Sequence, residues 1–405
     1  MDDQEEKAIS ARDVISALAV FVFVWGSLWL GSTDISIGGG DLGKLRTTAR
    51  DGLQSVMAAA GNLFTTSLEI TTGTDENLGE AGNQAVDEND SAKTRQASPL
   101  PTLLPGTANA SHGDKKITPS DPGVRTLKIL IGGDVMLDRG IRKLGEKNGY
   151  ETLFADLTPL FKEADLVVAN LEGPITTSPS KTLLANGKIS PELTFTFAPK
   201  TATALAKAGF TTVSLANNHT GNFYQTGLDQ TRKYLRAAGL EYFGSPSNAS
   251  SSSLTVNKNG ISVAFVGYHA FSPGFDGILT SIERLSKEGY FVIVMPHWGE
   301  EYASTSSASM KNQARKFVAA GAKAIFGAHP HVVEDHNYIG DVPVFYSLGN
   351  LLFDQYFSSE VMRGNLVEMI LEETPEGVII RSLRIYETST ASKQGVKLVG
   401  SPVDF

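Results

Sequence analysis

Short apolar runs rich in Val, Ile and Leu alternate with stretches of helical periodicity from about residue 125 to about residue 387. This alternation is typical of an α/β domain, so we predict one layered α/β unit of about 260 residues at 125–387. The predicted strands are 127–132, 165–171, 211–216, 261–267, 290–296, 322–327 and 342–348. The predicted helices are 152–163, 200–208, 225–238 and 308–320.

Two further strand-like runs close the domain, at 365–373 and 377–387. The turn signal Pro375-Glu376-Gly377 between them predicts an antiparallel pair. We assign the remaining residues, 388–405, to a C-terminal tail.

An apolar segment without charged residues occupies positions 14–30 and is long enough to cross a bilayer as a helix. We predict a transmembrane anchor at 14–31, preceded by a tail at 1–13. A cleaved signal peptide is the alternative, but no A-x-A-like site follows, and the run exceeds the usual apolar core of such peptides. Basic residues flank both sides, so the positive-inside rule does not fix the orientation.

Residues 73–122 are rich in Asp, Glu, Ser, Asn, Gly and Pro, and no aromatic residue occurs between Phe64 and Tyr150. Such a segment cannot bury enough apolar surface to offset the entropy lost on ordering. We therefore predict a juxtamembrane segment and disordered linker at 32–124. A tether of this kind favours a single-pass protein of the cell membrane whose folded domain lies outside the cytoplasm.

Composition narrows the possible classes of function. Thirty-five basic against 44 acidic residues give a net charge of −9, which argues against nucleic acid as the main partner. The chain has no cysteine, which excludes disulfides, thiolate metal sites and cysteine nucleophiles. Neither a G-x-x-x-x-G-K-[ST] phosphate loop nor a G-x-S-x-G nucleophile elbow occurs.

Residues able to bind metal or move protons follow six of the predicted strands. The carboxyl ends of strands in open α/β sheets form the crevice in which ligands bind, so we expect these side chains to meet at one rim. Four of the seven histidines lie at these ends, which scattered surface histidines would rarely do. The residues are Asp134, Asn170, Glu172, Asn217, Asn218, His219, His297, His329, His331, Asn350 and Asp354.

Carboxylate, imidazole and amide ligands without thiolates suit Mn²⁺, Fe or Zn²⁺. A carboxylate such as Glu172 can bridge two ions about 3.5–4 Å apart, which lower the pKa of bound water and hold both oxygens of an in-line displacement. We therefore predict a site for two divalent metal ions. The chemistry that it favours is phosphoester hydrolysis, although the same pair can assist attack on other electrophiles.

Six motifs, in this order, resemble those of the CapA family of poly-γ-glutamate capsule biosynthesis proteins, which is related to the calcineurin-like metallophosphoesterases. They are GDVML at 133–137, NLEGPI at 170–175, LANNH at 215–219, HWGEEY at 297–302, GAHPHV at 327–332 and SLGNLLFDQ at 347–355. The resemblance covers about residues 126–357 and extends towards the hairpin ending at 387, but not the anchor or the linker. It implies a metallophosphatase-like αββα sandwich.

The resemblance also implies roles for individual residues. Asp134 matches the first metal-binding Asp, and Glu172 matches the bridging carboxylate. Asn218 is implied as a metal ligand, and His219 as the general acid or the group that stabilises the leaving group. The other implied metal ligands are His297, His329 and His331.

Three positions depart from the family pattern. Asn222 and Tyr224 stand where Asp and Gly are usual, and Glu334 stands where Gln is common. Because Asn222 replaces the usual Asp, a carboxylate near the rim is missing, and we do not expect Asn222 to support the metal ligands.

A further set of residues is predicted to surround the substrate or to support the ligands. Trp298 and Tyr302 are expected as pocket walls, and Arg139 either faces a substrate anion or pairs with a neighbouring carboxylate. His269 and His336 are assigned structural or peripheral positions. The full set is Arg139, Asn170, Asn217, Trp298, Glu301, Tyr302, Asn350 and Asp354, of which the last two are expected to orient metal ligands.

Two functions remain open. The first is a membrane-anchored, metal-dependent hydrolase acting on an envelope polymer, a lipid-linked precursor or another extracytoplasmic ester or amide. The second is a non-catalytic component of a capsule or poly-γ-glutamate assembly, in which the same pocket grips an anionic polymer through metal and arginine. The partners expected are the lipid bilayer and either poly-γ-glutamate or capsule synthesis subunits. The complete set of ligands favours catalysis, because a scaffold needs no aligned imidazoles.

Overall fold

The computed structural model describes residues 124–249 and 253–405. The anchor predicted at 14–31 and nearly all of the linker predicted at 32–124 lie outside the described residues. Within the described ranges, no helix is long and apolar enough to cross a membrane. The described part is a mixed α/β domain built on two sheets.

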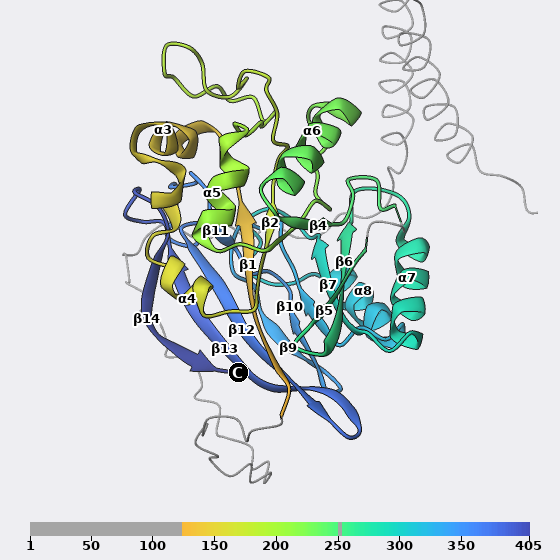
Figure 1. The fold of residues 1–405 in the computed structure, drawn as a ribbon. Coiled ribbons are helices and arrows are strands. Elements are labelled where there is room, and N and C mark those ends of the chain that lie inside the picture. The colour runs from red at the N-terminus through yellow and green to blue at the C-terminus, as the bar shows by residue number, and fades with distance from the viewer. Residues whose placement is uncertain (1–123, 250–252) are drawn as a thin grey trace, which may run out of the picture. The chain divides into compact units, whose positions relative to one another are not determined.

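The first sheet has eight strands: β1 Thr126–Val135, β2 Leu166–Leu171, β3 Thr212–Ser214, β4 Glu241–Phe243, β11 Asn350–Leu352, β12 Arg363–Thr374, β13 Gly377–Ser389 and β14 Lys397–Asp404. Their order is β14-β13-β12-β1-β2-β3-β4, and β11 pairs in parallel with the end of β1 (Figure 1). Strands β1 to β4 run parallel, whereas β12, β13 and β14 join as an antiparallel meander.

The second sheet has six strands: β5 Leu254–Lys258, β6 Ile261–His269, β7 Phe291–His297, β8 Ala324–Phe326, β9 His336–Ile339 and β10 Val342–Phe345. Their order is β5-β6-β7-β8-β10-β9. The four inner strands are parallel, and the two edge strands pair antiparallel. Parallel strands in both sheets place several carboxyl ends where side chains can meet.

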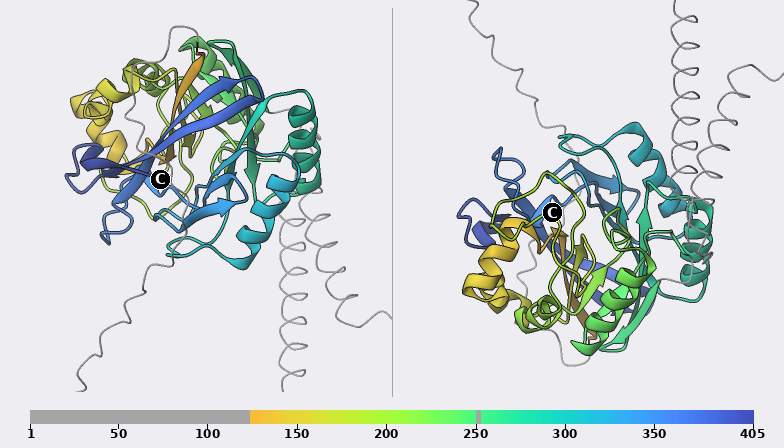
Figure 2. Two further views of the ribbon diagram at one scale, coloured as in Figure 1. Left: turned by 90° about the horizontal axis from the view of Figure 1, so that it is seen from below. Right: turned by 90° about the horizontal axis from the view of Figure 1, so that it is seen from above.

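Helices cover the outer faces of the two sheets. They are α3 Arg139–Asn148, η1 Tyr150–Phe154, α4 Thr158–Lys162, α5 Lys200–Ala208, α6 Tyr224–Ala237, α7 Phe275–Lys287 and α8 Ala308–Ala319. Figures 1 and 2 show α3 to α6 beside the first sheet and α7 with α8 beside the second, with the strands between them.

The alternation of side chains along the inner strands explains this layering. In β1, Ile129 and Ile131 join a buried cluster that also contains Val263 and Phe265 of β6, so this cluster fills the space between the sheets. Leu130, between them in sequence, belongs to a second cluster with residues of the α3–α6 layer. A third cluster joins the outer face of the second sheet to α7 and α8. Both faces of the central strands are therefore buried, whereas edge strands such as β9 and β14 are largely exposed.

Three of the predicted helices agree with α5, α6 and α8 to within one residue at each end. The helix predicted at 152–163 is instead divided into η1 and α4, because Pro159 lies in the first turn of α4 and cannot continue a preceding helix. Helices α3 and α7 were not predicted. Residues 397–404, assigned to a C-terminal tail, form β14 at the edge of the first sheet.

The loop of residues 176–198, between β2 and α5, is attached to the fold through Asp138. This carboxylate is fully buried and accepts hydrogen bonds from Ser180 Oγ (2.8 Å), Thr182 Oγ1 (2.8 Å) and the backbone N–H of Thr196 (3.0 Å). It also accepts a hydrogen bond from Arg142 Nε at 2.7 Å. One carboxylate therefore fixes both ends of the loop against the start of α3.

Replacing Asp138 by Ala is expected to lower the free energy of unfolding by about 2–4 kcal/mol, because buried donors and the Arg142 guanidinium lose their acceptor. Urea unfolding measures this loss, and limited proteolysis should show cleavage within residues 176–198. Glu146→Ala on α3 is the control: its ion pair with Lys200 is exposed and contributes less than about 1 kcal/mol. Equal stability of the two variants would contradict the anchoring role.

Candidate metal centre

Residues from both sheets converge at the carboxyl ends of parallel strands. Asp134 lies at the end of β1, Glu172 directly follows β2, and His297 ends β7. His329 and His331 follow β8 in the segment that leads towards β9. The convergence that the sequence predicted for these five residues is present, and their roles remain predictions.

Two trios of side chains could each hold a metal ion: Glu172 with His297 and His329, and Asp134 with Glu172 and His331. Within each trio, one potential ligand atom from every residue lies within 4.8 Å of the others. All five residues are buried. Glu172 belongs to both trios, which is the position that a bridging carboxylate requires.

The Glu172 carboxylate is fully buried, and neither of its oxygens has a hydrogen-bond partner among the described residues. Imidazole nitrogens face its Oε1 atom, from His331 at 3.8 Å, His219 at 3.9 Å and His297 at 4.0 Å. Burial raises the pKa of Glu172 well above 4.5, and the negative charge of Asp134 raises it further. An anionic acceptor without donors is costly in a protein interior, so this carboxylate fits a site for cations.

Two imidazoles of the cluster, those of His297 and His329, are held neutral. Burial lowers the pKa of His297 well below 6.5, and the neighbouring His329 lowers it further. Burial also lowers the pKa of His329 to about 4, with a smaller contribution from His331. Neutral imidazoles present lone pairs, and lone pairs bind metal ions. Asn218 adds an oxygen to this group, because its Oδ1 lies 2.9 Å from His297 Nε2.

The loop that carries His329 and His331 adopts an unusual backbone. Both residues have positive φ angles, 99° and 60°, which are costly for residues other than glycine. The backbone N–H of His329 donates to Asp134 Oδ2 at 3.1 Å, which ties this loop to the end of β1. Such strain is tolerated where the surroundings hold it, and here it turns both imidazoles towards the carboxylates.

Asn350, at the start of β11, contacts His331, one of the predicted metal ligands. The Asn350 amide nitrogen donates to the backbone carbonyl of Val361 at 2.9 Å, which identifies its Oδ1 as an acceptor. That oxygen lies 3.0 Å from His331 Nδ1, so Nδ1 carries the proton and Nε2 is left as a lone pair near Glu172. The geometry thus selects the imidazole tautomer that can bind metal.

A pair of amides connects the strand ends behind the cluster. Asn170 Nδ2 donates to Asp134 Oδ1 at 2.7 Å, and its Oδ1 accepts from Asn217 Nδ2 at 2.9 Å. Asn217 Oδ1 in turn accepts from the backbone N–H of Thr220 at 2.8 Å. Both predicted amides therefore support the cluster from behind.

Asn222 contacts His219, in contrast to the expectation that it would have no supporting role. Its Oδ1 accepts from the backbone N–H of Phe195 at 2.9 Å and lies 3.1 Å from His219 Nδ1. Nδ1 is therefore the protonated nitrogen, and Nε2 is directed to Glu172 and the cavity. Burial lowers the pKa of His219 to about 4.

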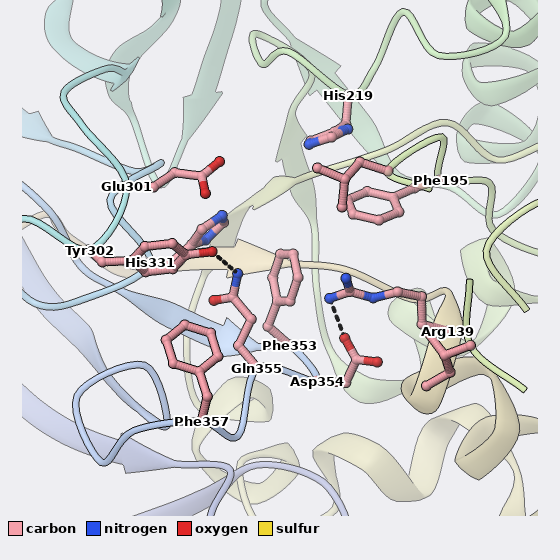
Figure 3. Close-up of a pocket in the computed structure, with 12 residues that line it drawn as sticks. Arg139, Phe195, His219, Glu301, Tyr302, His331, Phe353, Asp354, Gln355 and Phe357 are labelled. Carbon is pink, nitrogen blue, oxygen red and sulfur yellow. Dashed lines mark hydrogen bonds and ion pairs between the residues drawn. The ribbon is translucent and has the colours of Figure 1, made fainter. Parts of the chain in front are cut away.

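A cavity of about 260 Å³ opens beside the cluster (Figure 3). Arg139, Glu301 and Tyr302 line it, in agreement with the prediction, together with His219 and His331. Its other lining residues are Ile189, Leu193, Phe195, Phe353, Asp354, Gln355 and Phe357. Sequence reasoning missed the aromatic and aliphatic members, since no strand-end pattern marks them.

Arg139 lies between the rings of Phe195 and Phe353, with its guanidinium carbon 5.1 and 5.3 Å from their centroids. It forms an ion pair with Asp354, whose second oxygen accepts from the backbone N–H of Gly140 at 2.8 Å. Asp354 thus orients Arg139. The prediction that Asp354 orients a metal ligand is wrong. Arg139 Nε is buried and has no partner in the described chain. The guanidinium is therefore fixed in the cavity wall with donor capacity left.

Trp298 is not a pocket wall, which corrects a second prediction. It is fully buried, and its Nε1 donates to the carbonyl of Tyr346 at 2.8 Å in the cluster beneath α8. Successive side chains alternate across a strand, so Trp298 points away from the side that His297 faces.

Of the histidines assigned elsewhere, His336 lies exposed on β9 and stacks on Phe345. His269 is buried and closer to the cluster than a peripheral residue would be, with its ring centroid 6.1 Å from that of His297. Glu334 is buried outside the cavity lining, and burial raises its pKa to about 7.

The family model described as bacterial capsule synthesis protein PGA_cap matches residues 128–355. The capsule biosynthesis protein CapA of Bacillus anthracis is 32% identical over 250 residues, 56% of this chain and 60% of that protein. The PGA biosynthesis protein CapA of Bacillus subtilis (strain 168) is 28% identical over 247 residues, 56% of this chain and 64% of that protein. The chain therefore spans less than two thirds of either relative.

Among solved structures, the crystal structure of TT1561 of Thermus thermophilus aligns with 60% of this chain and 93% of that chain. The identity is 13% and the TM-score is 0.35.

Proposed function

Because the chain belongs to the PGA_cap family of bacterial capsule synthesis proteins, we propose that it acts in capsule or poly-γ-glutamate biosynthesis as a metal-dependent hydrolase of the phosphoesterase type. The observation that carries the proposal is the Glu172 carboxylate, fully buried, without hydrogen-bond partners among the described residues and faced by three imidazoles within 4.0 Å. The two-sheet α/β domain is consistent with a metallophosphatase-like sandwich.

The donors present fit two divalent ions, of the Mn, Fe or Zn type. Asp134, Glu172 and His331 would hold one, and Glu172, His297, His329 and Asn218 would hold the other. Ions in these positions would supply Lewis acidity, which lowers the pKa of water and stabilises negative charge on an ester oxygen.

His219 is the residue that we assign to proton transfer. In ester hydrolysis the oxygen of water bonds to phosphorus and gives up a proton to solvent, the bond from phosphorus to the leaving oxygen breaks, and that oxygen takes up a proton. His219 Nε2 faces the cavity, while Asn222 holds Nδ1. An anionic substrate beside the ring raises the pKa of the imidazole from its low value, so that Nε2 can carry this proton.

Arg139 is assigned to the substrate anion. Its guanidinium is fixed by Asp354 and two aromatic rings, so little side-chain entropy is lost when an anion binds. The same feature favours the second candidate function, a non-catalytic component that grips an anionic polymer. The two functions differ in turnover, which only the first requires.

Membrane attachment is part of the proposal and rests on the apolar segment at 14–30. We place the catalytic domain outside the cytoplasm, beside envelope substrates. Fractionation of cells followed by protease treatment of intact protoplasts tests this placement. Recovery of the intact chain in the soluble fraction, or full protection from protease, would argue against it.

Changing His219 to Ala is expected to lower kcat on an aryl phosphate ester by about 10²–10⁴-fold while leaving metal content unchanged. Asn222→Ala should lower kcat by about tenfold, because the His219 ring loses the contact that fixes its tautomer. His336→Ala is the matched control, since that ring lies on β9 outside the site. Turnover in His219→Ala equal to that of wild type would remove the proton-transfer role. A metal-loaded wild type with no turnover on an ester and peptide panel would support the non-catalytic alternative.

A further inference from the structure

Four of the residues that line the cavity are exposed apolar side chains: Ile189 (50% exposed), Leu193 (54%), Tyr302 (44%) and Phe357 (66%). We call this set the apolar collar. Ile189 and Leu193 belong to the loop of residues 176–198, and the rings of Tyr302 and Phe357 pack edge to face at 5.1 Å. Figure 3 shows Tyr302 and Phe357 on the side of the cavity opposite Phe195.

The exposed apolar side chains of the collar are clustered at one place on the protein surface. Eleven large hydrophobic side chains are exposed in the described part of the chain, and four of them line this one cavity. Single exposed hydrophobic residues are ordinary, but a group around a polar cavity indicates a binding surface. The loop that carries two of them is held in place by Asp138, so the collar is built into the fold.

The buried part of the cavity lining carries polar groups beside the rings of Phe195 and Phe353. Arg139 and His219 lie there with His331, which is one of the proposed metal ligands. At about 260 Å³ the cavity is smaller than most small-molecule sites, which start at about 300 Å³, so it admits a head group and leaves the rest of a substrate at the mouth. The part of a substrate beyond its head group therefore meets the exposed lining residues, four of which form the collar and the fifth of which is Glu301.

We propose that the collar binds the hydrocarbon chain of an amphiphilic substrate, a lipid-linked phosphate whose anionic head reaches Arg139 and the metal centre. This inference rests on the proposed function and specifies its substrate class. A glutamate polymer fits less well, because each of its residues brings a carboxylate that would lose hydration against Leu193 and Phe357. Arg139 is the only lysine or arginine among the residues lining the cavity, and Glu301 adds negative charge.

Binding of alkylphosphonates of increasing chain length tests the proposal without requiring turnover. The metal-loaded segment Asn109–Phe405, which contains the three buried clusters of the described residues, is titrated calorimetrically with ethyl-, hexyl- and decylphosphonate. Each methylene that reaches the collar should tighten binding by up to about fourfold. The double variant Leu193→Ser/Phe357→Ser should bind ethylphosphonate as wild type does and lose most of the dependence on chain length.

Leu184→Ser is the matched control, because Leu184 is exposed on the same loop but does not line the cavity. It should retain the wild-type dependence on chain length. Wild-type affinity that does not change with chain length, or an unchanged dependence in the double variant, would overturn the proposal. A glutamate oligomer that binds the protein more tightly than decylphosphonate, and displaces it, would also overturn the proposal. A retained chain-length dependence in a protein without turnover would instead count against the hydrolase function alone.

Discussion

Replacing Glu172 by Gln is expected to stabilise the metal-free protein and to abolish its stabilisation by divalent metal ions. In the metal-free state, a buried carboxylate without donors destabilises the fold, and a neutral amide of the same shape removes the charge. The gain in the free energy of unfolding should be about 1–3 kcal/mol near neutral pH. With metal at 100 times its Kd, wild type should gain about 2.7 kcal/mol per site, and the variant should gain almost nothing.

The free energy of unfolding that Glu172→Gln gains in the metal-free state depends on pH. The folded-state pKa of Glu172 lies above the unfolded value of 4.5, so the folded protein holds this proton more tightly. The stability that the proton contributes is present below pH 4.5 and is lost as pH rises through the folded-state pKa. The difference between Glu172→Gln and wild type should therefore be near zero at acid pH and grow towards neutral and alkaline pH.

Urea unfolding of both proteins across this pH range, with chelator and then with Mn²⁺ or Zn²⁺, measures these effects. A variant that is less stable than wild type in chelator at neutral pH would show that Glu172 has partners in the metal-free protein. A variant that gains as much stability from metal as wild type would show that the carboxylate is not a ligand.

The double change of His329 and His331 to Ala is expected to remove bound metal almost completely. The two imidazoles belong to different trios, so their loss leaves each of the two proposed ions one ligand short. Metal content should fall from between one and two equivalents to near zero, and turnover should fall with it. Elemental analysis of protein purified without chelator gives the metal content directly.

His336→Ala controls for the loss of an imidazole, because His336 is exposed on β9. Circular dichroism of the double variant checks that its fold is retained, since both positions have positive φ angles that the new side chains must also adopt. Full metal content in a folded double variant would contradict the assignment of these residues as ligands.

The inner strands and amphipathic helices could be predicted because each is coded locally. Residues 200–208, 225–238 and 308–320 carry a clear helical period, and α5, α6 and α8 follow it closely. β14 carries no such signal, because it is an edge strand with exposed residues such as Val403 and needs no apolar run. β4 has only three residues, too few for a period to show, whereas β3 lies within the strand predicted at 211–216.

The cluster could be anticipated because strand direction carries the ends of parallel strands to one place, whatever loops intervene. The direction in which a single side chain points could not be anticipated in the same way. Trp298 comes directly after His297 in the sequence but faces the opposite layer. Contacts such as Asn222 with His219 depend on how a turn folds back on itself. The collar depends on the path of the loop at 176–198, for which the sequence offers no periodic signal.

Anomalous diffraction from crystals of the segment Asn109–Phe405 grown with Mn²⁺ would show whether strand ends of both sheets share one metal cluster around Glu172. We expect two anomalous peaks about 3.5–4 Å apart, both in contact with the Glu172 carboxylate. One should be shared with Asp134 and His331, and the other with His297 and His329. A map without a peak at Glu172, or with metal bound only elsewhere on the protein, would contradict this expectation.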